Sequence, residues 1–196
     1  MALYRHRLEG TFPGETWSFG VHTDSSLSVA AMHSQWMTGI TNAWASWAPL
    51  LCTDVEATRA TTVELDPATG RQLTGAEDVR SDVGTSTATC LPFQCAPVVS
   101  LRTATLNRRG RGRFYVPSLA VDQVDGGRMT TAAQTALADG AADLLAGLTS
   151  AGGTVVIYHR DLGSTSVVTS LDVGDVIDTQ RRRRNQLIES RTSRPL

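Results

Sequence analysis

The feature that most constrains the fold is an apolar stripe of helical period between residues 27 and 47. Large apolar side chains recur there at steps of three and four residues, which is the spacing of one helix face. We predict a helix over 27–47, begun by Asp24, Ser25 or Ser26 and ended by Pro49. An aromatic stripe can be a ligand platform, but at this spacing it favours core or a subunit interface. The stripe is formed by Val29, Met32, Trp36, Ile40, Trp44 and Trp47.

Runs in which apolar and polar residues alternate predict strands on both sides of this helix. Residues 3–21 form a strand pair around a Pro-Gly turn, and 55–65 leads through a second turn into a return strand. The Thr/Ser-rich stretch 81–90 is expected to be a loop. Later strands are predicted at 98–105, 113–119, 154–160 and 165–173, with a turn at 107–112.

A second helix is predicted before the last two strands, and its N-cap is Thr130 or Thr131. The apolar face of this helix consists of Ala133, Leu137, Ala141, Leu144 and Leu148.

The predicted fold class is α+β, with two amphipathic helices packed on a mainly antiparallel sheet. The order of elements suggests two β-β-α-β units, although the halves show no residue-level repeat. A chain of 196 residues fits one well-filled domain, so we expect a single domain over 1–196 with a basic C-terminal tail from about 179. No apolar run approaches the roughly 18 residues that span a bilayer, so no membrane partner is expected.

Several catalytic classes are excluded by what the sequence lacks. All eighteen basic residues are arginine, which excludes phosphate-binding loops with a lysine, Schiff-base amines and kinase-type lysines. The nucleophile elbow, the His-Glu-x-x-His motif, the dinucleotide glycine fingerprint and the calcium loop are also absent. We therefore expect no enzymatic activity and no cofactor.

No metal site is expected either. Cys52, Cys90 and Cys95 lack the close spacing of zinc ligands and are typical of small buried thiols in a reducing compartment. Asp172, Asp175 and Asp178 recur at three-residue steps and could hold a divalent ion or act as paired carboxylates of a hydrolase. Neutralisation by the arginines that follow them is the simpler explanation.

The arginines are clustered, and this is the chief functional signal. Residues 1–98 carry five arginines against ten acids, whereas 99–196 carry thirteen against nine. Such asymmetry favours copies that meet head to tail. Because a guanidinium binds carboxylates and phosphates at two points, clusters of it predict an interface. The candidate contact residues are Arg102, Arg108, Arg109, Arg111, Arg113, Arg181, Arg182, Arg183 and Arg184.

Each cluster has more than one interpretation. The cluster at 102–113 is interpreted in two ways. It is either a hairpin turn followed by a strand, or a loop whose glycines allow close approach of nucleic acid and whose neighbours Phe114 and Tyr115 stack on bases. The cluster at 181–184 is a solvated tail, an inter-subunit clamp or a nucleic-acid contact.

Two strings carry a family resemblance, SLRTATLNRRGRGRFYVPSL at 100–119 and DVGDVIDTQRRRRNQL at 172–187. They resemble a family of small uncharacterised bacteriophage virion structural proteins, and the match lies mainly in the second half. The resemblance implies a non-enzymatic protein that self-assembles into a head-tail connector, a tail terminator, a tail tube or a coat. It implies copies of itself and other virion proteins as partners, and location in the virion after assembly in the host cytoplasm. The alternative is a nucleic-acid-binding coat or packaging protein that uses the arginine clusters.

Overall fold

A computed structural model describes the chain from residue 1 to 173 with gaps. The described residues are 1–12, 15–87, 89, 97–104, 109–115, 119–125, 128–146, 148, 153–161 and 164–173. From residue 97 onward, side chains are described only for 119–123, 130–146 and 148, and the strands of this part are described by their backbone course.

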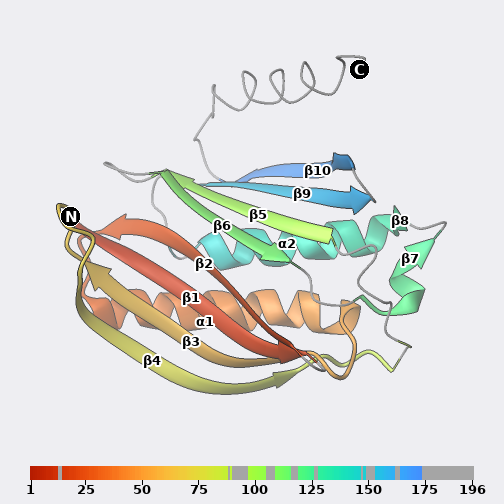
Figure 1. Cartoon of the computed structure of the whole chain (residues 1–196), viewed down its shortest axis with the longest axis horizontal. Helices are drawn as coiled ribbons and strands as arrows, with labels where there is room; N and C mark the ends of the chain where they lie inside the picture. Colours follow the sequence, from red (N-terminus) through yellow and green to blue (C-terminus); the bar gives the residue numbers. More distant parts are fainter. Residues whose placement is uncertain are drawn as a thin grey trace, which may run out of the picture.

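Two four-stranded antiparallel sheets and two long helices make up this fold, which is α+β as predicted (Figure 1). The first sheet has the order β2-β1-β3-β4, formed by β1 (Ala2–Phe12), β2 (Glu15–Ser25), β3 (Glu56–Leu65) and β4 (Gln72–Val83). The second has the order β10-β9-β5-β6, formed by β5 (Pro97–Ala104), β6 (Arg109–Tyr115), β9 (Gly153–Asp161) and β10 (Ser164–Val173). The helices are α1 (Val29–Trp47) and α2 (Thr131–Ala146), and the short elements are η1 (Ala48–Leu50), η3 (Val121–Gln123), β7 (Val124–Asp125) and β8 (Arg128–Met129).

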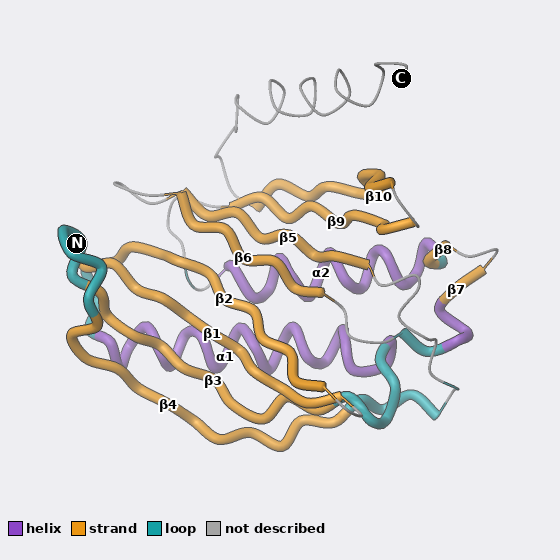
Figure 2. The backbone as a smooth tube through the Cα atoms, in the orientation of Figure 1, coloured by secondary structure: helices purple, strands orange, loops and turns teal. Residues whose placement is uncertain are grey.

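The two halves have the same topology. In each, a hairpin is followed by the long helix and then by a second hairpin, and the first strand of each hairpin lies at the centre of the sheet. The predicted β-β-α-β unit is therefore present twice, and one further strand completes each unit. The halves meet where β2 contacts β6 and where α1 and α2 lie side by side (Figure 2). This arrangement leaves β4 and β10 as the outer strands.

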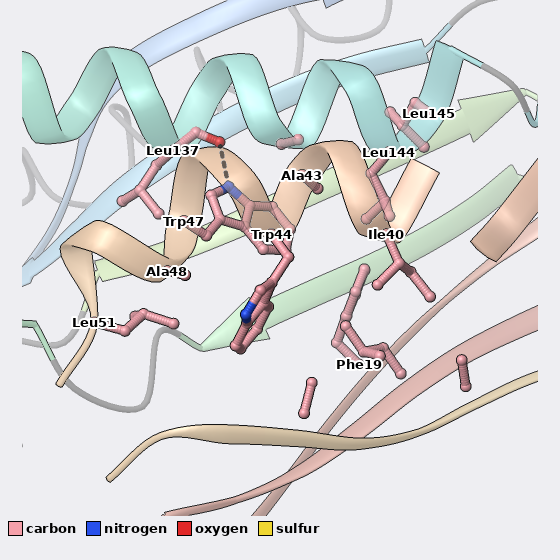
Figure 3. Close-up of a cluster of buried hydrophobic side chains, with 14 of the residues drawn as sticks. Phe19, Ile40, Ala43, Trp44, Trp47, Ala48, Leu51, Leu137, Leu144 and Leu145 are labelled. Atoms are coloured by element: carbon pink, nitrogen blue, oxygen red, sulfur yellow. Dashed lines mark hydrogen bonds between the residues drawn. The ribbon is translucent and has the colours of Figure 1, made fainter. Parts of the chain in front are cut away.

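The core lies around the contact between α1 and α2 (Figure 3). The Trp47 indole Nε1 donates a hydrogen bond of 3.2 Å to the backbone carbonyl of Leu137. A Cβ at Gly39 would lie 3.1 Å from the carbonyl oxygen of Leu144, so the two helix backbones approach closely there. The tryptophan stripe is core, as predicted, and its buried members are Met32, Trp36, Ile40, Trp44 and Trp47.

The start of α1 differs from the prediction. Ser28 is the N-cap, and its hydroxyl oxygen accepts a hydrogen bond of 3.3 Å from the Ala31 N–H. The predicted caps Asp24, Ser25 and Ser26 are wrong, because β2 continues through Ser25 and delays the helix.

The start of α2 agrees with the prediction. The Thr130 hydroxyl oxygen accepts a hydrogen bond of 3.2 Å from the Ala133 N–H. The whole predicted apolar face of this helix is buried.

Three further predictions need correction. Residues 109–112, predicted as a turn, belong to β6, because their alternation of arginine and glycine has the two-residue period of a strand. The stretch 81–90, predicted as a loop, contributes residues 81–83 to β4. Cys52 is fully buried but disulfide-bonded, so the expectation of three reduced thiols is wrong. Within the described part of the chain, no helix is both long and apolar enough to cross a membrane.

Candidate functional site

The outer strand β4 is the most unusual surface of the described structure. It runs for twelve residues along the open side of its sheet, and none of these twelve residues is buried. A strand at a sheet edge presents unpaired backbone N–H and C=O groups, which can bind another strand. Most natural edge strands are short or covered, and β4 is neither.

Exposed apolar side chains accompany this open backbone. Leu73 is 61% exposed, Val79 is 86% exposed and Val83 is 43% exposed. Charged residues lie between them, with Glu77 and Asp78 in the middle and Asp82 near the end. Strand pairing shifts register twice between β3 and β4, which bends the edge locally. Bulges and charges of this kind limit indiscriminate strand pairing. We therefore expect β4 to pair only with a strand that is complementary to it.

The solvent face of the same sheet carries a polar depression of about 320 Å³ lined by β1, β3 and β4. The Arg7 Nε lies 2.9 Å from Glu9 Oε1, and an Arg59 Nη1 lies 3.6 Å from Glu9 Oε2. Arg59 also pairs with Glu77; this hydrogen bond raises the pKa of Arg59 and lowers the pKa of Glu77. Among the described residues Arg5 has no ion pair. Two carboxylates therefore offset two of the three guanidiniums, which leaves a weakly cationic depression.

A buried polar chain lies on the opposite face of this sheet, toward α1. Nε2 of His6 lies 2.8 Å from the Thr23 hydroxyl, and Nδ1 of His6 lies 3.0 Å from the Thr62 hydroxyl. Nδ1 of His33 lies 3.1 Å from the same Thr62 hydroxyl. Nε2 of His33 lies 3.4 Å from the half-exposed carboxylate of Asp78 on β4.

One set of proton positions suits all the hydrogen bonds among the histidines and threonines, while Nε2 of His33 lies 3.4 Å from Asp78 Oδ2 without making a hydrogen bond. A threonine hydroxyl has a single proton, so Thr62 donates to one imidazole and accepts from the other. If Thr62 donates to His33, the Nε2–H of His33 faces the Asp78 carboxylate. His6 then donates from Nδ1 to Thr62 and accepts at Nε2 from Thr23. This is the favourable direction, because the reverse would place a lone pair of His33 against the carboxylate.

The buried histidine chain contains the residue types of a catalytic triad, but its hydroxyl group is not accessible to a substrate. Asp78, His33 and Thr62 are in the order of acid, base and hydroxyl nucleophile. Thr62 is fully buried, however, and its oxygen also contacts His6. A substrate cannot reach this hydroxyl in the structure. Burial lowers the pKa of His6 to about 3, with further contributions from His33 and His22, so His6 is neutral at pH 7.

The backbone brings together some of the arginines predicted as contact residues. Arg102 on β5 is the direct cross-strand partner of Arg111 on β6. Arg109, Arg111 and Arg113 alternate along β6 and therefore take positions on the same face of this hairpin. Like charges at directly opposite positions destabilise a sheet unless another group compensates them.

The other predicted contact residues lie outside the described residues. These are Arg108 and the run Arg181 to Arg184, and Asp175 and Asp178 also lie there. Among the residues whose side chains are described, no three His, Cys, Asp or Glu side chains are grouped to hold a metal ion. The sequence predicted a return strand after 55–65, which is β4, but neither its full exposure nor the buried histidine chain was predicted. A signal for the exposure of β4 was present, since 72–83 lacks the apolar alternation of a half-buried strand.

Comparisons with models of known protein families, with curated proteins and with solved structures gave no match for this chain.

Proposed function

We propose that this chain is a non-enzymatic bacteriophage virion structural protein that self-assembles into a particle component. A head-tail connector, a tail terminator, a tail tube and a coat are the candidate components. The strings at 100–119 and 172–187 support the virion assignment through their family resemblance. The partners are copies of the chain itself and other virion proteins, and the location is the virion after assembly in the host cytoplasm.

One observation carries the self-assembly, the long open edge formed by β4. This strand of twelve residues is paired with β3 on one side, and on its outer side it leaves backbone groups without a strand partner, together with three exposed large apolar side chains. A second strand on this edge would bind the free backbone groups and would cover part of the Val79 side chain through cross-strand contact. Particle subunits repeat one such contact many times, and a contact between two different edges closes a ring or continues as a tube.

Light scattering after size exclusion tests the proposal on the full chain. We expect masses of several copies that rise with concentration, and negative-stain images that contain rings, tubes or shells. A strict monomer at high concentration, also in the presence of the products of neighbouring genes, would contradict self-assembly.

A nucleic-acid-binding coat or packaging protein is the second candidate. The register that places Arg102 opposite Arg111 supports it, because phosphate groups would offset the repulsion between these positions. Binding to single-stranded nucleic acid should then weaken with salt. Replacement of Arg181 to Arg184 by alanine should reduce the log-log slope by about 0.7 for each phosphate that an arginine no longer neutralises. Absence of binding at low salt would remove this candidate.

A further inference from the structure

We propose that β4 pairs in antiparallel fashion with β10 of a second copy, which joins the copies head to tail into one continuous sheet. This inference rests on the proposed self-assembly and specifies the contact through which it occurs. The occupant of the β4 edge is therefore a second copy of this chain.

The directions of the strands permit this contact. β4 and β10 are the outer strands of the two sheets, and no described strand lies beyond either of them. In Figure 1 the arrow of β4 runs opposite to that of β10. A second copy displaced across the strands, without rotation, would therefore present β10 antiparallel to β4. Twelve residues of β4 would face ten residues of β10, so the two strands are matched in length.

The molecule already places one edge of the first sheet beside one edge of the second, although no described backbone ladder joins these two edges. β2 is the last strand of the first sheet and β6 is the last strand of the second, and these two strands meet inside the molecule. β4 and β10 hold equivalent places in the two halves. A contact between them would therefore again bring a first-half sheet against a second-half sheet, this time between two copies. A row of copies would then alternate first and second halves without interruption.

Charge favours β10 over a second β4 as the partner. β4 carries Glu77, Asp78 and Asp82 against Arg80, a formal charge of −2. If two β4 strands paired, each would carry a formal charge of −2, and like charges on facing strands destabilise the pair. β10 carries a single charge, that of Asp172. That charge is negative as well, but the repulsion of −2 against −1 is smaller than that between two β4 strands.

A photo-crosslinking experiment on the full chain tests the contact. The photoreactive residue p-benzoylphenylalanine replaces Val79, whose high exposure makes the substitution harmless to folding. An equal mixture of ¹⁴N-labelled and ¹⁵N-labelled copies is irradiated, and tryptic peptides are analysed by mass spectrometry. Crosslinks between copies appear as mixed-isotope pairs. The β4 peptide ends at Arg80, and the peptide that contains all of β10 begins after Arg160 and ends at Arg181.

We expect mixed-isotope crosslinks from the β4 peptide to the β10 peptide. The same photoreactive residue at Val121, which is also exposed but belongs to η3 and to neither edge strand, is the control and should not form this crosslink. Crosslinks between two β4 peptides, or to another element, would overturn the inference and leave self-assembly intact. Assembled protein without a crosslink to β10 would overturn it as well. A sample that stays monomeric in light scattering would overturn both the inference and the proposed function.

Discussion

Gly140 on α2 lies directly against the indole of Trp47 on α1. A Cβ at Gly140 would lie 2.5 Å from Nε1 and 2.8 Å from Cδ1 of that ring, far inside van der Waals contact. The same indole nitrogen donates to the Leu137 carbonyl one turn earlier on α2. The absence of a side chain at Gly140 is therefore what allows the two central helices to touch.

Replacement of Gly140 by alanine should destabilise the protein by about 1–3 kcal/mol through overpacking. An exposed helical glycine behaves in the opposite way, since alanine gains about 1 kcal/mol of helix propensity. Urea unfolding measures the difference. Asp139→Ala, at the exposed neighbouring position, is the control and should change the free energy of unfolding much less. Equal or greater stability of Gly140→Ala would show that the helices do not pack as described.

Replacement of Ser28 by alanine should cost about 1 kcal/mol, because the Ala31 N–H loses its acceptor. Ser26→Ala is the matched control, since Ser26 is exposed and precedes the cap by two residues. Thermal unfolding of both variants distinguishes the two positions. A larger loss at Ser26 than at Ser28 would contradict the assigned start of α1.

The pKa of His6 predicts a loss of stability in acid. Its value is about 3 in the folded state against an ordinary value of 6.5, so the unfolded state binds the proton more readily. Stability from this group is complete above about pH 6.5 and falls as pH decreases toward 3, by about 1.4 kcal/mol per pH unit. Urea unfolding at several pH values measures this slope. His6→Gln, which has no titratable group, should lower the slope by about one proton, and an unchanged slope would assign the acid sensitivity elsewhere.

Replacement of Val79 by aspartate should reduce assembly and leave the unfolding temperature unchanged. The side chain makes little contact within its own copy, so its removal costs little stability. A fourth acid on β4 would add repulsion and would be desolvated at an interface. Val121→Asp is the control at another exposed valine. Light scattering that gives both variants the mass of the parent protein would argue against β4 as the assembly edge.

Elements with a strong period could be predicted from the sequence because burial imposes that period. The spacing from Val29 to Trp47 indicated both the helix and its buried face, and Trp36 and Trp47 are core. The cap was missed because several acceptable caps stand in a row before Ser28, and only the end of β2 decides among them. The alternation of arginine and glycine from 109 to 112 was interpreted as part of a turn because glycine is more common in turns, although pairing with β5 makes it a strand.

The histidine chain could not be predicted, because its partners are distant in the sequence. His6 and Thr62 are separated by 56 positions, and only the register between β1 and β3 brings them together. The arginines could be identified as a group from the sequence. Their placement at opposite positions on β5 and β6 depended on the exact start of β6, which the sequence did not reveal.

The shared topology of the halves has a consequence for how the protein is made. Every described strand ladder of three or more residue pairs joins strands of the same half. The described backbone hydrogen bonds between the halves are isolated, such as the one from the Ala120 N–H to the Leu50 carbonyl. Short chain closures form before long ones, so each sheet can form from its own segment. We therefore expect the first sheet to form on the ribosome while the second half is still being synthesised. We expect docking of α1 against α2 to come last and to cover Trp47, whereas Trp36 and Trp44 already contact residues of the first half.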